Sequence, residues 1–488
     1  MKRFSFFLPL VIILASCDGI LSSSILLTSF SSETSITSVS TSALPAIINI
    51  DLYNLNDFHG AVDHNPSNKE LGINRLAGYF KTQLANNPNS VFLSSGDMWQ
   101  GSADSNITRG RLVVDAMNQI GFSAMAIGNH EFDWTDEYLY LNQTRSDFPL
   151  LGINIIDKAT NQRAAFADAS VMIERSGIQI GIIGTIGDTL ESTILTSAVA
   201  PYEFVPYKNL VKDESQRLKN LGADLIVLVN HNGTVESEVM PYVDAVFNGH
   251  THRREVFHID GKPVYQGLAY GQAISHVRFA FNTVNMIPSF IQNQSGVYTY
   301  DSLISSNQFP QEDLDMKALY DVYLINEINE VKNEVIGEAD GAFSRQQLGQ
   351  FAVEEMLRFG QTKKQDVVAS FHNSGGVRST IDAGEVTYGD LYKAFPFDNE
   401  LMIVEVTGSQ LLWWLSAGLY MRTIANLTPV DTNETYWIIS INFLTERHLE
   451  SSSYPHDLDT AINTYQYIRE QLKTRWLSVG TIRASDYN

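Results

Sequence analysis

The stretch VDAVFNGHTHRRE, residues 243–255, begins as an apolar run and ends in two histidines, His250 and His252, that are separated by one residue. Such an ending is typical of an α/β fold, because side chains beyond the carboxyl ends of parallel strands collect at one edge of the sheet and bind ligands there. The chain has only 11 histidines. Other apolar runs that end in the same way would therefore belong to the same site.

Four further apolar runs end in side chains that can bind a metal. They are IINIDLYNLND (47–57), which leads into Asp57 and His59; SVFLSSGD (90–97), which ends at Asp97; SAMAIGNHEFD (123–133), which contains Asn129; and DLIVLVNHNG (224–233), which contains His231. Carboxylate, imidazole and amide ligands together suit Zn, Mn, Co or Fe, whereas an all-oxygen set would indicate Ca or Mg. Seven candidate ligands exceed the need of one ion, so we expect two divalent metal ions that share a bridging carboxylate.

The pattern along the chain predicts an α/β protein, because short apolar runs alternate with helical stretches from Ala46 onward. Helical spacing also predicts a connecting helix over 311–335, on the apolar residues Leu314, Ala318, Val322, Ile325, Ile328 and Val331. A closing helix is predicted in the same way from Leu458, Ile462, Tyr465, Ile468 and Leu472.

Length and charge limit the classes of function. A chain of 488 residues is too long for one compact core and indicates two or three domains. Its formal net charge of -22 opposes a surface that follows nucleic acid phosphates. We therefore expect no nucleic acid partner, and the oligomeric state is left open.

The N-terminus has the features of an export signal. Lys2 and Arg3 precede a short apolar run that ends before Cys17, the only cysteine of the chain, and the residues around Cys17 resemble the lipobox of bacterial lipoproteins. This resemblance implies a signal peptide over 1–16, a lipid on Cys17 and a location at the extracytoplasmic face of the cell membrane. The serine- and threonine-rich residues 17–45 are predicted to be a tether.

The ordered motifs D-x-H, G-D, G-N-H-E, a single histidine and G-H-x-H resemble the calcineurin-like metallophosphoesterase superfamily over residues 46 to about 285. The resemblance implies that one metal is held by Asp57, His59, Asp97 and His252. The other would be held by Asp97, Asn129, His231 and His250, with Asp97 as the bridge. His130 would stabilise charge on the phosphoryl oxygens or the leaving group, Asp133 would orient its ring, and Glu131 would support the loop.

The second half of the chain resembles the C-terminal domain of 5'-nucleotidases. The resemblance lies in N-x-G-G-x-R at 373–378 and in F-P-F-x-N at 395–399. It implies the substrate-binding residues Arg345, Asn373, Gly375, Gly376, Arg378, Phe397 and Asn399. The block G-G-D-G-[YF], whose aromatic closes a base sandwich in that family, is absent from ISINFLTERHLESSSYPHD (439–457), and Tyr454 is the expected substitute.

Together the two resemblances imply a four-layer metallophosphoesterase domain with mixed sheets (46–310), a connecting helix (311–336) and a second α/β (α+β) substrate-binding domain (337–488). The expected activity is two-metal hydrolysis of nucleoside 5'-monophosphates for nucleotide salvage. Two enzymatic alternatives use the same centre: a phosphodiesterase for 2',3'-cyclic nucleotides, and a pyrophosphatase for nucleotide sugars or dinucleotides. A non-catalytic surface binding lipoprotein is the alternative from another class.

Overall fold

The computed structural model describes residues 47–447 and 456–488. The signal peptide, Cys17, the whole tether and Tyr454 lie outside the described residues, so these predictions concern parts of the chain with no structural account. None of the helices in the described ranges has both the length and the apolar character that a bilayer crossing requires.

The first sheet carries three of the predicted metal motifs. Its strand order is β15-β14-β1-β2-β3-β4, with β16 also paired to β14. Strands β1 to β4 are parallel and β14 runs antiparallel to β1, so the sheet is mixed. The strands are β1 Ile47–Leu55, β2 Ser90–Ser94, β3 Phe122–Ala126, β4 Leu150–Leu151, β14 Ala273–Asn282, β15 Pro288–Phe290 and β16 Gly296–Thr299.

The second sheet has the order β12-β13-β11-β10-β8-β7 and is also mixed, since β7 and β12 are antiparallel to their neighbours. The strands are β7 Ser170–Arg175, β8 Ile178–Ile186, β10 Leu225–His231, β11 Ala245–Asn248, β12 Arg254–Ile259 and β13 Lys262–Gly267. Buried side chains of both sheets, such as Leu52 and Leu93 from the first and Ile182 and Val227 from the second, form one apolar cluster. The two sheets therefore pack face to face.

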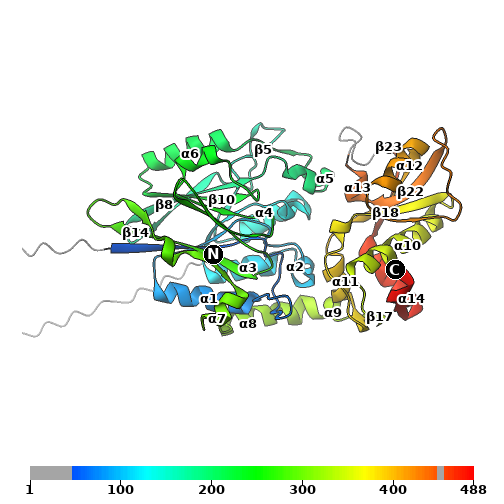
Figure 1. Cartoon of the computed structure of the whole chain (residues 1–488), viewed down its shortest axis with the longest axis horizontal. Helices are drawn as coiled ribbons and strands as arrows, with labels where there is room; N and C mark the ends of the chain where they lie inside the picture. Colours follow the sequence, from blue (N-terminus) through cyan, green and yellow to red (C-terminus); the bar gives the residue numbers. More distant parts are fainter. Residues whose placement is uncertain (1–46, 448–455) are drawn as a thin grey trace, which may run out of the picture. The chain divides into compact units, whose positions relative to one another are not determined.

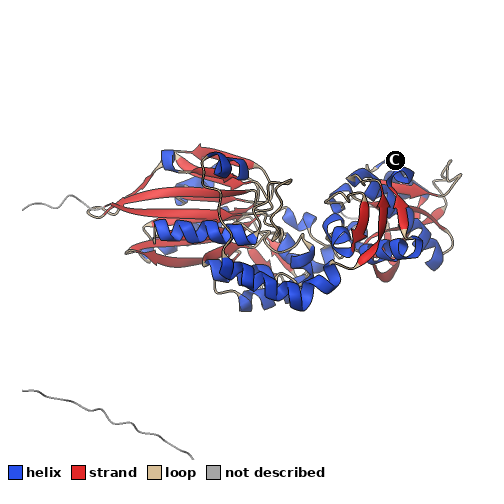
Figure 2. Cartoon of the chain, turned by 90° about the horizontal axis from the view of Figure 1, so that it is seen from below, coloured by secondary structure: helices blue, strands red, loops and turns tan. Residues whose placement is uncertain are grey.

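Helices cover the outer faces of the two sheets, which gives the four layers visible in Figures 1 and 2. Helices α1 and α3 bury Leu76, Phe80 and Val113 with the first sheet, and α6 buries Val211 and Leu218 with the second. The helices are α1 Ile73–Asn86, α2 Ala103–Ile107, α3 Arg111–Ile120, α4 Thr135–Arg145, α5 Thr196–Val199, α6 Lys208–Asn220 and α7 Tyr300–Ser305. A small sheet joins β5 Ile155–Asp157, β6 Gln162–Arg163 and β9 Tyr202–Phe204.

A continuous helical stretch follows, consisting of α8 Leu314–Tyr323, a π-helical turn Leu324–Ile328 and α9 Asn329–Lys332. The helix is present as predicted, but the prediction of its buried face is largely wrong. Leu314, Val322 and Ile325 are 76%, 55% and 76% exposed. The buried face consists of Met316, Tyr320, Tyr323 and Ile328, which join the core of the first domain. Tyr320 and Tyr323 lie outside the predicted apolar face, yet their rings are buried while their hydroxyls donate to acidic side chains.

The C-terminal domain is a second α/β unit with its own core. Its main sheet has the order β21-β18-β22-β20-β23, beside a small sheet β19-β17-β24. The strands are β17 Val335–Asp340, β18 Val367–His372, β19 Gly384–Thr387, β20 Glu400–Thr407, β21 Tyr420–Thr423, β22 Thr435–Ile441, β23 Asp457–Tyr467 and β24 Thr481–Arg483. The helices are α10 Arg345–Lys363, α11 Tyr388–Ala394, α12 Gly408–Ser416, α13 Asn442–Thr445 and α14 Ile468–Val479.

The predicted closing helix is correct only in its second half. Residues 457–467 form strand β23, which pairs antiparallel with β20, and helix α14 begins at Ile468. A spacing of four residues fits one helical face, but it also fits two periods of a strand. Threonine, isoleucine and tyrosine residues in this segment favour the strand. Ile462 and Tyr465, both assigned to the helical face, are 41% and 81% exposed.

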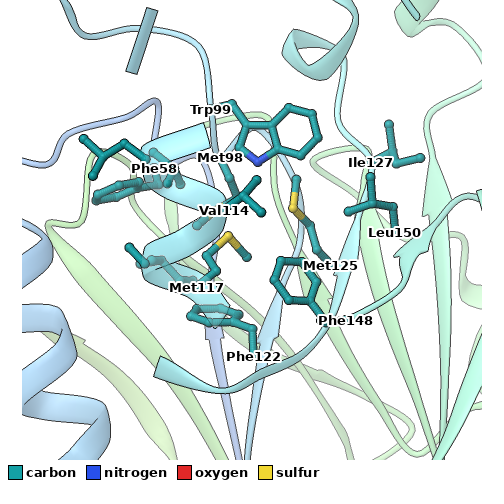
Figure 3. Close-up of a cluster of buried hydrophobic side chains, with 14 of the residues drawn as sticks. Phe58, Met98, Trp99, Val114, Met117, Phe122, Met125, Ile127, Phe148 and Leu150 are labelled. Atoms are coloured by element: carbon teal, nitrogen blue, oxygen red, sulfur yellow. The ribbon is translucent and has the colours of Figure 1, made fainter. Parts of the chain in front are cut away.

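The loops that carry the metal motifs are anchored in the core (Figure 3). Phe58 stands between Asp57 and His59, Met98 and Trp99 follow Asp97, and Ile127 precedes the G-N-H-E motif. Each of these apolar side chains is at most 1% exposed. In each of these loops a candidate ligand lies within two residues of a buried apolar side chain that packs the loop against the core.

Candidate metal centre and substrate pocket

All seven predicted ligands lie at the carboxyl ends of parallel strands. Asp57 and His59 follow β1, Asp97 follows β2 and Asn129 follows β3. In the second sheet His231 is the last residue of β10, and His250 and His252 follow β11. The structure therefore brings together residues that are far apart in the chain, at one end of the two packed sheets.

The ligand atoms form two groups whose members are close to one another. One group contains Asp57, His59 and His252, and the other contains Asp97, His231 and His250; within each group the candidate atoms lie within 4.8 Å of one another. The Nε2 atoms of His59 and His252 are 3.0 Å apart, so two lone-pair-bearing nitrogens face the same point. These groups are consistent with a dinuclear metal site.

Asn129 completes the second group through its amide oxygen. This Oδ1 atom lies 3.1 Å from Nε2 of His231 and 3.0 Å from Nδ1 of His250. Oδ2 of Asp97 lies 3.1 Å from Nε2 of His231. The donor set of carboxylate, imidazole and amide oxygen therefore fits two borderline divalent cations.

The backbone is bent sharply at these ligands. Asp57, His59, Asp97, His250 and His252 all have positive φ, between 50° and 81°. Non-glycine residues rarely adopt this left-handed conformation, and it persists only where the surroundings fix it. Glycine is required beside them: a Cβ on Gly128 would lie 2.2 Å from Oδ1 of Asp97, and one on Gly249 would lie 2.6 Å from the carbonyl of Ser95.

Glu131 holds two of these loops. Its buried carboxylate accepts hydrogen bonds from the backbone N–H groups of Asp97, Met98 and Gly128, at 2.9, 2.8 and 2.7 Å. It does not belong to either ligand group. Burial and the nearby charge of Asp97 raise the pKa of Glu131 to about 7.

Two metal-facing histidines have a fixed tautomer. Nδ1–H of His59 donates to the carbonyl of Gln100 at 2.9 Å, and Nδ1–H of His231 donates to the carbonyl of Ser95 at 2.7 Å. Each ring therefore presents Nε2 to the site. Burial lowers the pKa of His59 to about 3 and that of His250 to about 4, so both are neutral at neutral pH, as metal binding requires.

Asp97 is held in its ionised form by the histidines around it. Burial by itself raises the pKa of Asp97, but His231 and His130 outweigh burial and hold this pKa well below its usual range. Burial lowers the pKa of His231, whereas Asp97 reverses this and raises it to about 9. Metal binding at His231 would therefore displace a proton.

His130 and Asp133 form a pair beside the metal groups. Nδ1 of His130 lies 2.7 Å from Oδ2 of Asp133, so its Nε2 is left for the site. Burial lowers the pKa of His130, but the charges of Asp133 and Asp97 outweigh it, and the pKa lies above its usual value. The His130 ring faces Phe397, with ring centroids 5.6 Å apart.

A cavity of about 520 Å³ joins the metal groups to the C-terminal domain. Its metal-domain lining includes Asp97, Asn129, His130, Asp133, His250 and His252. Of the predicted substrate residues, it is lined by Asn373, Gly375, Gly376, Arg378, Phe397 and Asn399. Arg345 does not line it, but donates to the carbonyl of Val377 at 2.6 Å and so supports the loop that carries Arg378.

Comparison with known families agrees with this two-part site. Residues 52–254 match the calcineurin-like phosphoesterase family, and residues 327–423 match the 5'-nucleotidase C-terminal domain. The chain combines the two domains of 5'-nucleotidases. It has an α/β metallophosphoesterase domain and a second α/β domain that matches the 5'-nucleotidase C-terminal domain.

The individual proteins that resemble this chain are distant in sequence. The "Probable 5'-nucleotidase" of Treponema pallidum (strain Nichols) is 25% identical over 442 residues, which cover 74% of each chain. "Endonuclease YhcR" of Bacillus subtilis (strain 168) is 25% identical over 401 residues, which cover 74% of this chain but only 32% of that protein. The crystal structure of a 5'-nucleotidase precursor from Thermus thermophilus shares the fold, with a TM-score of 0.74 at 18% identity, over 89% of this chain and 97% of that one.

The cavity also contains residues that sequence reasoning missed. Among them are Phe443 and Arg447, which lie in the region where the glycine-rich block of the 5'-nucleotidase family is absent. The guanidinium carbon of Arg447 lies 5.0 Å from the centroid of the Phe443 ring, much as that of Arg378 lies 5.2 Å from Phe397. The signal in the sequence is an aromatic residue, Phe443, two positions after the end of strand β22.

Proposed function

We propose that this protein hydrolyses nucleoside 5'-monophosphates to nucleoside and phosphate. The observation that carries the proposal is the single cavity lined both by members of the two groups of metal ligands and by Arg378, Phe397 and Asn399. A phosphate bound at the ligand groups and a nucleoside bound at the aromatic end would occupy one continuous space. Two divalent ions bound there would act as a Lewis acid toward the phosphoryl group and would supply hydroxide at neutral pH.

We assign His130 the role of the general acid that protonates the leaving group. Its Nδ1 is occupied by Asp133, so its Nε2 is the atom that can donate to a phosphoryl oxygen or to the departing 5'-oxygen. Hydrolysis breaks the bond between phosphorus and this oxygen, and the oxygen must gain a proton to leave as an alcohol. The raised pKa of His130 favours the protonated ring that this role requires.

We assign nucleoside recognition to the residues of the C-terminal domain that line the cavity. Arg378 offers a planar fork for phosphate or ribose oxygens, and Phe397 offers a ring face for a base. Phe443 adds a second aromatic side chain to the same cavity. Stacking tolerates all bases, at about 1 to 3 kcal/mol each, so comparable kcat/KM values are expected for purine and pyrimidine monophosphates.

Diester hydrolysis is the second candidate. A relative that matches 74% of this chain is named an endonuclease, and an endonuclease cleaves phosphodiesters. Both activities would use the same ligands, because the metal groups recognise the phosphoryl group rather than the leaving group. Two complete ligand groups beside His130 disfavour the purely binding alternative, which needs neither.

The deciding experiment is a substrate panel in which nucleosides, nucleotides and inorganic phosphate are separated and quantified by chromatography, because diester hydrolysis releases a monophosphate rather than inorganic phosphate. Purified mature protein is depleted of metal with EDTA and reloaded separately with Mn, Zn, Co or Fe, then offered AMP, UMP, a 2',3'-cyclic nucleotide, a dinucleotide and glycerol 2-phosphate. We expect no turnover without metal and the highest kcat/KM for AMP and UMP. Preferential hydrolysis of the cyclic nucleotide or the dinucleotide would replace this proposal with one of the diester alternatives.

We also propose that the chain is exported and anchored at the extracytoplasmic face of the membrane by lipid on Cys17, as the lipobox-like N-terminus indicates. Wild-type protein should sediment with membranes, and Cys17→Ser should yield soluble or unprocessed protein. Mass spectrometry of the mature N-terminus provides the check. An unmodified Cys17 on a cleaved chain would refute the anchor.

A further inference from the structure

The segment Phe395–Asn399, which connects α11 to β20, is held by side chains of the first domain. The carbonyl of Pro396 accepts two hydrogen bonds, from Nε2 of Gln100 at 3.1 Å and from Nδ2 of Asn106 at 2.6 Å. Gln100 and Asn106 are 1% and 2% exposed. The segment that carries Phe397 and Asn399 is therefore docked by its backbone onto the loop that follows Asp97.

Asp398 connects the same segment to both domains. One carboxylate oxygen pairs with Nη1 of Arg109 from the first domain, and the other accepts from Nη2 of Arg469 at 2.5 Å. Arg469 also donates to the carbonyls of Phe395 and Phe397, at 2.8 and 3.3 Å. Each oxygen of Asp398 thus has a partner in a different domain.

Arg109 is already oriented within the first domain. Its carbonyl accepts from Nδ2 of Asn142 at 3.0 Å, and its guanidinium carbon lies 5.6 Å from the ring centroids of both Trp134 and Tyr138. A guanidinium held against aromatic faces needs little further ordering to bind a carboxylate.

Gln100 links this docking to the metal groups. Its carbonyl accepts from Nδ1 of His59, the bond that fixes the tautomer of this ligand, while its side chain binds Pro396. One buried residue therefore contacts both a metal ligand and the segment that carries Phe397.

We propose that Arg109 and Asp398 are positioning residues for nucleotide hydrolysis, and that their ion pair fixes the segment Phe395–Asn399 at the distance from the metal centre that a nucleoside monophosphate requires. This inference rests on the proposed function, because it assigns Phe397 and Asn399 to the nucleoside. A substrate without a base does not reach that segment, so its hydrolysis does not depend on the pair.

The test compares Arg109→Gln, Arg109→Lys and wild type in the full-length, metal-loaded protein, with AMP and with glycerol 2-phosphate as substrates. Arg145→Gln is the matched control, because Arg145 forms an ion pair of similar exposure with Asp115 away from the cavity. We expect Arg109→Gln to raise KM for AMP about tenfold with kcat within about twofold, which corresponds to ordinary coupling between neighbouring groups. Arg109→Lys should restore part of the loss, and glycerol 2-phosphate kinetics should be unchanged.

A second readout does not depend on substrate. Hydrogen–deuterium exchange of the amides in 395–399 should be faster in Arg109→Gln than in wild type or Arg145→Gln. Unchanged exchange, unchanged KM for AMP, or equal losses with both substrates would each overturn the positioning role. A wild-type enzyme that does not prefer AMP over glycerol 2-phosphate would instead overturn the proposed function, and the exchange measurement would still decide whether the pair fixes the segment.

Discussion

At the scale of single residues, the site is defined by strained positions as much as by ligand chemistry. Five of the seven candidate ligands have left-handed backbone conformations, each of which costs on the order of 1–3 kcal/mol. Hydrogen bonds offset part of this cost: the backbone N–H of His250 lies 2.9 Å from each carboxylate oxygen of Asp57, and that of His130 lies 2.9 Å from Oδ1 of Asp97. The ligands are therefore arranged by the protein itself.

Asp97 should be the least replaceable ligand, because it is the predicted bridge between the two ions. We expect Asp97→Asn to lower kcat/KM by at least about 1000-fold, or ~4 kcal/mol, and to reduce bound metal. His252→Ala should cost less, since it serves one ion. His130→Ala is the control: kcat should fall about 100-fold or more while metal content stays normal. Metal analysis beside steady-state kinetics separates the three, and wild-type rates in Asp97→Asn would contradict the bridge.

The sequence predicted that the candidate ligands lie together, but it did not predict all of their neighbours. Asp57, Asp97, Asn129 and His231 could be found because each follows or ends an apolar strand, and the carboxyl ends of parallel strands meet. Phe443 and Arg447 reach the cavity through the packing of the C-terminal domain, so the aromatic residue near the end of β22 is visible in the sequence but its place in the cavity is not.

At the scale of elements, Glu131 connects the loops after β2 and β3 by accepting three backbone hydrogen bonds. Removal of this carboxylate would leave three buried N–H groups without an acceptor and would free Asp97 to move. We expect Glu131→Ala to weaken metal affinity about 10- to 100-fold, as loss of a partner behind a ligand commonly does.

Titration of Mn into metal-free protein measures this effect. Glu214→Ala is a suitable control, because Glu214 is also buried and paired, with Arg217 and Ser170, but lies on α6. Equal metal affinities in Glu131→Ala and Glu214→Ala would mean that Glu131 only stabilises the fold.

The elements also show where periodicity was insufficient. The four-residue spacing between Leu458 and Ile462 is compatible with a helix and with a strand. The segment forms a strand because its backbone pairs with β20. In the connecting helix, the spacing of apolar residues predicted the helix correctly but assigned the wrong residues to its buried face. Tyr320 and Tyr323 are buried there, whereas the aliphatic residues Leu314 and Ile325 are exposed.

At the scale of the whole molecule, the connecting helix belongs to the first domain. Tyr320 and Lys332 both bond to Asp63 and Asp104, and Arg111 pairs with Glu327. Any rotation of the C-terminal domain would therefore have to occur after Lys332, and not along the helix.

This assignment predicts how the chain can be divided. A fragment of residues 46–333 should fold, bind two metal ions and hydrolyse glycerol 2-phosphate, but should lose the preference for nucleotides. A fragment of residues 46–310 should be insoluble or unfolded, because it exposes the surface that buries Met316, Tyr320 and Ile328. Circular dichroism, metal analysis and kinetics of the two fragments provide the check, and efficient AMP hydrolysis by 46–333 would contradict the division of roles.

The pairing of β1 with β14 also sets an order of events during synthesis. Ile47 lies opposite Asn282, so β1 can pair with β14 only after more than half of the chain has been synthesised. The core of the domain is complete only when Ile328 has been added. At roughly 5–20 residues per second the interval from Ile47 to Ile328 is about 15 to 60 seconds. During that time the apolar strand Ile47–Leu55 has its parallel neighbour β2 but an open edge on the other side. A chain in this state is exposed to wrong strand pairing at that edge.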